Sequence, residues 1–272
     1  ALSSIVTIVQ AFGTQKMAKE NAIIKDLKAV ESLGCVSVIC SDKTGTLTQN
    51  KMTVQQIYMN HKVYEPREFN ISDQTQRYLL YDAVLNNDSS IVDGKGIGDP
   101  TEYALLEMLR NIYVDAGTFF DETEIHEDVL RRNMERLEEV PFDSDRKLMS
   151  SKYLLHGVPT ILTKGAVDVL LDRCTHVRSC NVVHPMTEQE KDKIRRQNEI
   201  FSQNGLRVLA FAYKESDEVL SPDTEYGFIF LGMVSMVDPP RPESMEAVAS
   251  AKRAGIRPVM ITGDHKITAV AI

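Results

Sequence analysis

The sequence predicts an α/β domain that is interrupted by an inserted α+β domain. Two compact, uncharged runs, residues 36–40 (VSVIC) and residues 258–262 (PVMIT), lie far apart in the chain. Such runs are typical of strands buried on both faces of a parallel sheet. The segment between them mixes helical patterns with strand-like runs that are close enough in sequence to pair antiparallel. We therefore expect a parallel sheet from the two ends and an antiparallel sheet from the middle.

The opening residues 1–12 (ALSSIVTIVQAF) form the most apolar segment, but they are too short to span a bilayer and contain Ser3, Ser4, Thr7 and Gln10. They predict a buried or amphipathic helix, and they lack the basic start and cleavage site of a secretory signal. A polar, helix-like stretch follows at residues 16–31, and residues 242–254 predict a helix that Gly255 ends. Taken alone, these features predict a soluble, cytoplasm-facing chain.

The middle of the chain predicts a separate domain with its own helices and strands. Helical patterns cover residues 74–87, 101–112, 129–139 and 187–204, and strand-like runs cover residues 152–155, 160–164, 206–213 and 226–236. Thr187 and Glu190 predict a capping box at the start of the last helix, and Gly205 predicts its end. The DPPR string at residues 238–241 predicts a return crossing, since consecutive prolines end a strand. Residues 93–98 (DGKGIG) fit neither a Walker nor a dinucleotide motif and predict a flexible loop.

The composition of the chain limits the kinds of partner that it can bind. Its 272 residues are 43% hydrophobic and 26% charged, as in a globular protein with a hydrophobic core. A formal net charge of -8 and a pI near 5.4 argue against a broad basic surface, so we expect no nucleic acid partner. Nucleotides need only local positive groups and stay possible. The four cysteines form no CxxC pair or zinc-like cluster, which favours reduced thiols in the cytosol.

Two acidic turns follow the two predicted parallel strands. Asp42 follows the first strand and Asp264 follows the second. Ligands of open α/β sheets bind beyond the carboxyl ends of the strands, so adjacent parallel strands would bring both turns to one site. Asp42 is a candidate nucleophile for a phosphoryl group, and Asp264 and the main chain near Thr44 are candidates for Mg²⁺. Near them, Lys43 would supply positive charge, Gly45 a tight turn that presents amides, and Thr262 a hydroxyl donor.

The string DKTGTLT at residues 42–48 resembles the phosphorylation motif of P-type cation-transporting ATPases. Further strings resemble other motifs of that family in the same order: GDPTEYALL at residues 98–106, PFDSDRKLMS at 141–150, KGA at 164–166, DPPR at 238–241 and TGDHKITAVAI at 262–272. The second of these and the last look most like the calcium-pump branch. The resemblance covers nearly the whole chain, although residues 58–97 carry little of it.

The resemblance implies a fold in which a Rossmann-like, haloacid-dehalogenase-type phosphorylation domain is interrupted by a nucleotide-binding domain. By it, residues 1–33 would be the end of a membrane helix and a stalk, residues 34–56 and 237–272 the incomplete phosphorylation domain with its hinge, and residues 57–236 the nucleotide-binding domain. The implied cofactors are ATP and Mg²⁺. The full-length protein would be a multi-pass membrane pump, with a cation, further pump domains and membrane helices as partners, and this portion would face the cytoplasm.

The resemblance also implies roles for individual residues. Asp42 would accept the γ-phosphate of ATP, with Asp42 and Thr44 at the metal. Lys43, Thr262, Gly263 and Asp264 would complete the catalytic group. The nucleotide would contact the residues Glu102, Phe142, Arg146, Lys147, Lys164, Gly165 and Arg207. Among these, Phe142 would stack on the adenine, Glu102 would approach the adenine end, and Arg207 would pair with the phosphates.

Two other functions are compatible with the same residues. Soluble haloacid-dehalogenase-type phosphatases carry a second Asp two positions after the nucleophile, where this chain has Thr44. Because a threonine cannot act as a carboxylate base near neutral pH, we expect the phosphoenzyme to persist, as a pump requires. The later GDGxND motif that supplies further magnesium-binding aspartates is absent from the sequence. The sequence is therefore also compatible with a nucleotide-binding module that binds ATP and turns it over poorly. The resemblance implies calcium as the transported ion, with sodium or potassium, proton and magnesium as alternatives.

Overall fold

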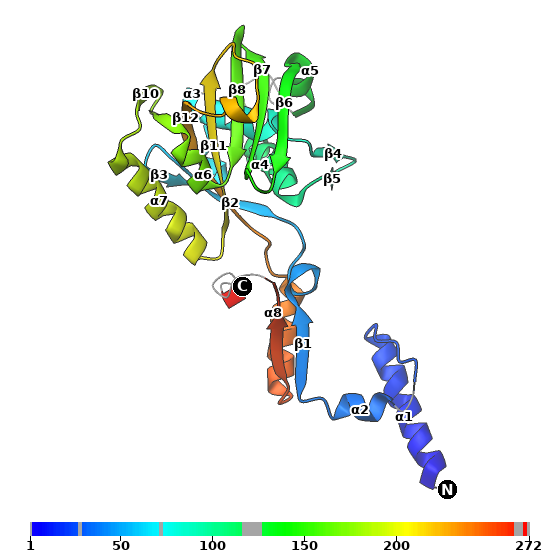
Figure 1. Cartoon of the computed structure of the whole chain (residues 1–272). Coiled ribbons are helices and arrows are strands. Elements are labelled where there is room, and N and C mark those ends of the chain that lie inside the picture. The colour runs from blue at the N-terminus through cyan, green and yellow to red at the C-terminus, as the bar shows by residue number, and fades with distance from the viewer. Residues whose placement is uncertain (1, 27–28, 71–72, 116–126, 264–268, 271–272) are drawn as a thin grey trace. The chain divides into compact units, whose positions relative to one another are not determined.

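The computed structural model describes residues 2–26, 29–70, 73–115, 127–263 and 269–270 (Figure 1). It divides the chain into two compact units. The first unit comprises residues 1–47 and 240–263, and the second comprises residues 48–239 and 264–272. The chain passes from the second unit back to the first between Pro239 and Pro240, within the string that predicted a return crossing.

The first unit contains a parallel strand pair. Its elements are α1 (Leu2–Lys19), α2 (Ala29–Gly34), β1 (Val38–Asp42), the short helical turn η1 (Lys43–Leu47), α8 (Pro242–Arg253) and β13 (Arg257–Ile261). Strands β1 and β13 pair in parallel, with Val38 opposite Arg257 and Asp42 opposite Ile261. Gly255 follows α8 with φ of +76°, a conformation that suits glycine at a helix end. The predicted parallel pairing and the predicted end of this helix are thus confirmed.

The prediction that the first strand is buried on both faces is wrong. In β1, Val38 is 46% exposed and Ile39 is 42% exposed, and in β13 Ile261 is 56% exposed. The reason is that this sheet has two strands in the part of the chain that the structure describes, and α8 has no buried residue.

Among the described residues, no helix has the length and the apolar character that a membrane span requires.

The second unit is a nine-stranded, mainly antiparallel sheet with helices on both faces. In chain order, the first elements of this unit are β2 (Thr53–Met59), β3 (Lys62–Tyr64), η2 (Pro66–Glu68), α3 (Gln74–Leu85), β4 (Ser90–Val92), β5 (Lys95–Ile97), α4 (Pro100–Asp115) and α5 (Glu127–Asn133). The remaining elements are β6 (Arg136–Asp143), β7 (Leu148–Leu155), β8 (Val158–Gly165), α6 (Val167–Asp172), β9 (Cys174–Ser179), β10 (Val182–Pro185), α7 (Glu188–Gln203), β11 (Arg207–Glu215), η3 (Pro222–Thr224) and β12 (Phe228–Val237). The strand order is β10-β9-β12-β11-β8-β7-β6, and the β2–β3 pair joins the same edge of β12 as β9. Only β9 and β12 pair in parallel among these strands.

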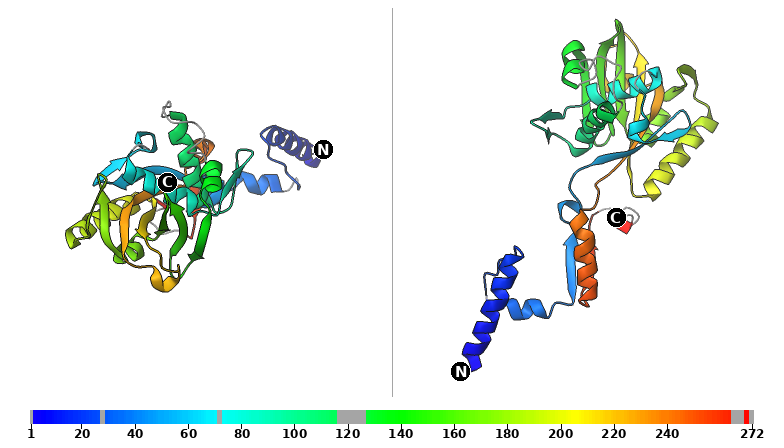
Figure 2. Two further views of the ribbon diagram at one scale, coloured as in Figure 1. Left: turned by 90° about the horizontal axis from the view of Figure 1, so that it is seen from above. Right: turned by 180° about the vertical axis from the view of Figure 1, so that it is seen from behind.

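Alternation along the strands divides the hydrophobic core of this unit into two clusters. In β11, Phe211 and Tyr213 belong to the cluster with α3, α4 and α5, whereas Ala210 and Ala212 belong to the cluster with α6 and α7. Successive side chains of a strand point to opposite faces, so one strand serves both clusters. Helices α3 and α4 lie over one face of the sheet, as the view from behind shows (Figure 2). The unit therefore has three layers, helix on sheet on helix.

The predicted helix over residues 129–139 is wrong in its second half. Helix α5 ends at Asn133, and β6 begins at Arg136. Glu138 and Glu139 favour a helix by intrinsic propensity, but tertiary contacts override that preference here. The carboxylate of Glu138 accepts a hydrogen bond from the Leu220 amide and lies 3.4 Å from the Lys152 ammonium. These partners are distant in sequence and fix the segment as an edge strand paired with β7.

The predicted flexible loop at residues 93–98 is a β-hairpin instead. Strands β4 and β5 pair antiparallel through a two-residue turn at Asp93 and Gly94. Both turn residues have positive φ, +49° and +74°, as a type I′ turn requires. An Asp-Gly pair between two short strands favours this turn, so the signal was present in the sequence.

At the start of α7, half of the predicted capping box forms. The Thr187 hydroxyl accepts a hydrogen bond from the Glu190 amide at 3.2 Å. The Glu190 carboxylate, however, pairs with His61 at 3.1 Å and Lys193 at 2.9 Å. The helix begins where it was predicted, and Gly205 follows it with φ of +73°.

Candidate functional site

Most of the residues predicted to contact the nucleotide gather at one end of the second unit's sheet. The strand registers place Asp143, Leu148, Gly165, Ala210 and Met233 in one row across β6, β7, β8, β11 and β12. Near this row lie the residues Phe142, Lys147, Lys164, Gly165 and Arg207, each in the row or within three positions of it along the chain. Antiparallel pairing thus brings together residues that are up to 65 positions apart in the sequence.

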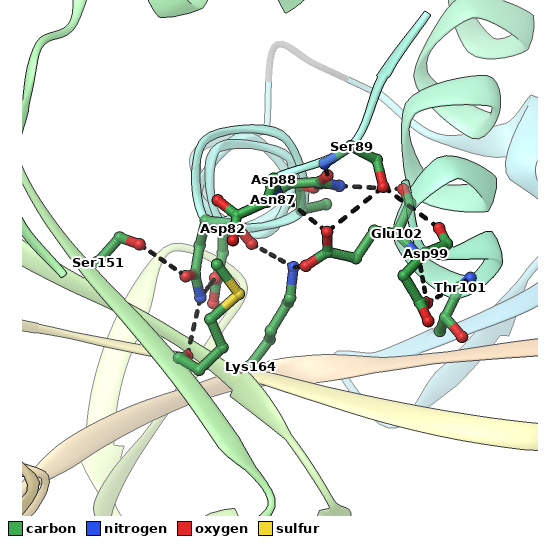
Figure 3. A network of polar contacts seen from close by, with 12 residues as sticks. Asp82, Asn87, Asp88, Ser89, Asp99, Thr101, Glu102, Ser151 and Lys164 are labelled. Atoms are coloured by element: carbon green, nitrogen blue, oxygen red, sulfur yellow. Dashed lines mark hydrogen bonds and ion pairs between the residues drawn. The ribbon is translucent and has the colours of Figure 1, made fainter. Parts of the chain in front are cut away.

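Lys164 and Glu102 form an ion pair at this end of the sheet. The ammonium of Lys164 lies 2.7 Å from a carboxylate oxygen of Glu102, and both side chains are largely buried, at 6% and 15% exposed (Figure 3). The same ammonium donates to the carbonyl of Asn86, the C-terminal capping residue of α3. Glu102 lies in the first turn of α4. The positive group therefore meets the C-terminus of one helix and the negative group meets the N-terminus of another, which is the favourable arrangement for both helix dipoles.

Further hydrogen bonds fix the Glu102 carboxylate. It accepts from the Asp88 amide at 3.0 Å and lies 3.4 Å from the Ser89 hydroxyl (Figure 3). Asp99 begins α4 by accepting from the Thr101 amide at 2.8 Å. Burial lowers the pKa of Lys164, and the charge and hydrogen bond of Glu102 act in the opposite direction. The pair thus keeps a buried cation in place with both partners hydrogen-bonded.

Asp82, in α3, is fully buried and lies close enough to Lys164 for the two charges to interact. One of its carboxylate oxygens accepts a hydrogen bond from the Asn86 side chain at 3.0 Å, and the other has no hydrogen-bond partner among the described residues. Asn86 also donates to the Met149 carbonyl and accepts from Ser151. Burial raises the pKa of Asp82 to about 7, against the opposing effects of the Asn86 hydrogen bond and the Lys164 charge. A carboxyl that titrates near neutral pH therefore lies close to the buried lysine.

Phe142, Arg207 and Lys147 are exposed residues near the same end of the sheet as this pair. The Phe142 ring is 62% exposed at the end of the edge strand β6. Arg207 is exposed and donates to the Thr101 hydroxyl at 2.9 Å, which connects it to the residue next to Glu102. Lys147 is exposed and has φ of +57° in the turn between β6 and β7. An exposed aromatic ring with cationic side chains near the same sheet end can accept a flat, anionic ligand.

Gly165 allows two backbones to approach each other closely. A Cβ atom at this position would lie 2.2 Å from the Lys147 carbonyl oxygen and 3.0 Å from the Leu148 Cα. In this structure, the residue that the Gly165 backbone approaches closely belongs to the turn before the neighbouring strand β7. The close approach also lets the Ala166 amide donate to the Lys147 carbonyl at 3.1 Å, which fixes the turn that carries Lys147.

Arg146 is engaged with protein groups. Its guanidinium pairs with the fully buried carboxylate of Glu225 and donates to the main-chain carbonyl of Pro141, next to Phe142. The other oxygen of Glu225 lies 3.1 Å from Arg173. These contacts hold the guanidinium of Arg146 between Glu225 and the main chain of β6.

In the first unit, Asp42 is exposed at the carboxyl end of β1. Its partner in the parallel register is Ile261, so Thr262 and Gly263 follow directly at the same sheet edge. After Asp42 the chain turns sharply: Thr44 has φ of -74° and ψ of 123°, and Gly45 has φ of +72°, a value that favours glycine. Lys43 is buried, and the Arg241 guanidinium donates to the Gly45 carbonyl at 3.1 Å. Asp264 lies outside the described residues.

Several residues of this site were not predicted from the sequence. They are Asp82, Asn86, Asp88, Ser89, Thr101 and Glu225. A signal existed for Asp82, since it is a lone acid in the apolar run YLLYDAVL. Residues 86–89 (NNDS) look like an ordinary polar loop, and only the fold brings them to Lys164.

Comparisons with known proteins identify the class of the chain. Residues 75–243, more than half of the chain, match the family model described as P-type ATPase, cytoplasmic domain N. The chain belongs to this family of P-type ATPases. Among curated proteins, it is 46% identical over its full length to calcium-transporting ATPase 1 of Bacillus cereus and 46% identical to a calcium-transporting ATPase of Listeria monocytogenes. It is 33% identical to the sodium/potassium-transporting ATPase subunit alpha-4 of Rattus norvegicus.

The chain spans only part of these relatives. It covers 30% of the length of each of the two bacterial proteins and 28% of the rat protein, while all of this chain is covered in each comparison. The family model covers the larger part of the second unit, including Lys164, Glu102 and Phe142. The Asp42 turn lies outside the family model but inside the regions matched in the bacterial relatives.

Proposed function

We propose that the second unit binds ATP and that the first unit carries the aspartate phosphorylated by it, in a pump that transports a cation. The observation that carries this proposal is the gathering of Phe142, Lys164, Glu102 and Arg207 at one end of the sheet. Phe142 offers an exposed ring on which the adenine stacks, a contact worth about 1–3 kcal/mol per base. Arg207 and Lys147 are exposed cations for the phosphates.

Lys164 and Glu102 form the floor of the proposed nucleotide site. Their ion pair is nearly dry and joined to α3 and α4 at both ends. A floor of this kind holds the surrounding polar groups at fixed positions before the nucleotide arrives, which lowers the entropy cost of binding. Two of the three N–H groups of the Lys164 ammonium donate to Asn86 and Glu102. The third can donate to an acceptor atom of a ligand.

Asp42 is the group that we propose accepts the γ-phosphate. Its exposed carboxylate at the mouth of a parallel strand pair is accessible to a nucleotide. The carboxylate oxygen would attack the γ-phosphorus, and the bond to the β-γ bridging oxygen would break to release ADP. Thr262 at the end of β13 would donate its hydroxyl to the transferred group.

The residues near Asp42 fit a magnesium ion. Mg²⁺ usually keeps several waters and uses one or two carboxylates together with substrate phosphates. Asp42 supplies one exposed carboxylate, and Thr44 supplies a main-chain carbonyl in the tight turn that follows. Bound there, the ion would neutralise charge on the phosphates during transfer.

The transported cation that we propose is calcium. Two relatives at 46% identity carry calcium-transporting in their names, whereas the sodium/potassium relative is 33% identical. The whole protein would be a membrane pump with this portion on the cytoplasmic side. Thr44 in the place of a second aspartate favours this function over a soluble phosphatase, because the acyl phosphate would be hydrolysed slowly.

Replacing Phe142 with alanine tests the nucleotide site. We expect the Kd for ATP, measured by calorimetric titration of the 272-residue chain, to rise about 5- to 150-fold, since one stacking contact is lost. Val219→Ala is the matched control, because Val219 is an exposed apolar residue, 73% accessible, in the same unit but outside the site. Its Kd should be unchanged. Equal affinities of the Phe142 variant and wild type would remove the stacking role.

The same chain is expected to bind ATP without sustained turnover. The nucleotide groups of the second unit are held in place, whereas the described residues contain no group of three or more acidic, histidine or cysteine side chains that could hold a metal ion. Release of inorganic phosphate in the presence of Mg²⁺ should stay close to the rate without protein. Steady hydrolysis that depends on Asp42 would contradict this expectation.

A further inference from the structure

We infer that Glu225 positions the aromatic platform of the nucleotide site by holding Arg146 against the main chain that leads into Phe142. This inference rests on the proposed function, because it assigns a role in ATP binding to a buried residue that does not itself reach a ligand. Glu225 follows the short helix η3 and precedes β12, and its side chain is fully buried.

Glu225 is the centre of a polar cluster with a complete set of partners. One carboxylate oxygen pairs with the Arg146 guanidinium and accepts from the Ser150 hydroxyl at 2.6 Å. The other oxygen lies 3.1 Å from Arg173. The Ser150 hydroxyl is also 2.8 Å from that of Thr163, so the cluster is joined to both β7 and β8. A buried carboxylate with two arginines and a hydroxyl is held in one orientation.

Arg146 transmits this orientation to Phe142. While one of its terminal nitrogens pairs with Glu225, the other donates to the main-chain carbonyl of Pro141. That carbonyl belongs to the peptide bond that leads into Phe142. Phe142 sits at the end of an edge strand with its ring exposed, so its own packing does little to fix it. The main-chain contact from Arg146 is therefore a restraint on the position of the ring.

The turn after Phe142 is restrained from the same side. The Asp143 carboxylate accepts from the amides of Asp145 at 3.0 Å and Arg146 at 2.8 Å, and Lys147 then adopts a positive φ. These bonds fix the main chain of the turn that carries Arg146. The cluster thus joins η3, which is remote in sequence, to the segment that would contact the adenine.

Arg173 provides the matched control within the same cluster. It shares the Glu225 carboxylate and is similarly buried, but among the described residues its side chain contacts Glu225 and the Tyr226 ring and forms no hydrogen bond to β6. Removing Arg173 disturbs the same buried carboxylate without releasing the Pro141 carbonyl. A general loss of packing would affect both arginine positions, whereas the proposed role requires Arg146 alone.

The test is a double-mutant cycle with Phe142, read as the Kd for ATP by calorimetric titration. In the wild-type background we expect Glu225→Gln to raise the Kd about 3- to 10-fold, and Arg173→Gln to change it less than about 2-fold. In the Phe142→Ala background we expect Glu225→Gln to add less than about 2-fold, because the ring it positions is gone. Affinity for inorganic tripolyphosphate, which has no base, should be the same with and without Glu225→Gln.

Equal losses in both backgrounds, or no loss in the wild-type background, would overturn the inference. Should the Glu225 variant fail to fold, as judged by its far-ultraviolet circular dichroism, Arg146→Lys replaces it in the same cycle with the same expected values. Lysine keeps the charge toward Glu225 but cannot bridge to Pro141 as a guanidinium does. If Phe142→Ala alone leaves the Kd unchanged, the proposed stacking role fails and the inference falls with it; an effect of Phe142→Ala without one of Glu225→Gln sinks the inference alone.

Discussion

Gly165→Ala is expected to destabilise the second unit by roughly 3 kcal/mol, because a methyl group cannot be accommodated between β7 and β8. The added Cβ would lie 2.2 Å from the Lys147 carbonyl oxygen, 2.6 Å from a Leu148 methyl carbon and 3.0 Å from the Leu148 Cα. Two of these atoms are main chain, so relief requires the paired strands to separate. The separation would also weaken the contact between the Ala166 amide and the Lys147 carbonyl.

The measurement is urea unfolding followed by tyrosine fluorescence. The chain has no tryptophan, and all nine tyrosines lie between residues 48 and 239, so the signal reports the second unit. Gly157→Ala is the control at the other end of the same hairpin, where a Cβ meets no atom within 4 Å but φ is +82°. Gly157→Ala should lower the free energy of unfolding by about 1 kcal/mol, because it introduces only the strain of a left-handed backbone conformation. A loss for Gly165→Ala no larger than that of the control would contradict the steric argument.

The parts of the fold that were predictable are those set by local pattern. Strand-like runs predicted β8, β11 and β12, and an uncharged run predicted β13. Helical patterns predicted α3 and α4, and helical patterns with end signals predicted α7 and α8. The segment from Arg136 was not predictable in this way, because two glutamates favour a helix and only contacts with Lys152 and Leu220 make it a strand. Sequence patterns report local preference, whereas edge strands depend on partners.

The candidate site was also predictable only in part. Motif resemblance predicted Phe142, Lys164, Glu102 and Arg207. The strand registers bring Phe142, Lys164 and Arg207 to one sheet end, and Glu102 reaches Lys164 from α4. The groups that hold them could not be predicted, because each contact joins remote positions. Lys164 reaches the Asn86 carbonyl across 78 positions, and Arg146 reaches Glu225 across 79. Such contacts follow from register and helix placement, which no local pattern specifies.

Asp82→Asn is expected to remove a pH dependence from the stability of the second unit. Asp82 has an ordinary pKa of 3.8 when unfolded, and burial raises its pKa to about 7 in the folded chain. The folded state therefore binds more protons than the unfolded state between these values, and stability falls as pH rises. This contribution is fully present below pH 3.8 and is lost as pH rises through about 7.

The size of the effect follows from the same two values. From pH 5 to pH 8, deprotonation of this carboxyl lowers the free energy of unfolding of wild type by about 2–3 kcal/mol. The Asp82→Asn variant does not show this decrease. Asparagine can still accept the hydrogen bond from Asn86 at 3.0 Å through its own carbonyl oxygen. Urea unfolding followed by tyrosine fluorescence at both pH values should therefore show that the free energy of unfolding of the variant, relative to that of wild type, is higher at pH 8 than at pH 5.

Asp88→Asn is the matched control for this comparison. Asp88 lies in the same network, but its carboxylate is 54% exposed and pairs with Arg136 at the surface. Its replacement should leave the difference between pH 5 and pH 8 within about 0.5 kcal/mol of wild type, because an exposed pair is screened by solvent. If Asp82→Asn and wild type lose stability in parallel over this range, the carboxylate is ionised in the folded chain with Lys164 as an effective counter-charge. The buried lysine would then be paired with two acids, Asp82 and Glu102, rather than one.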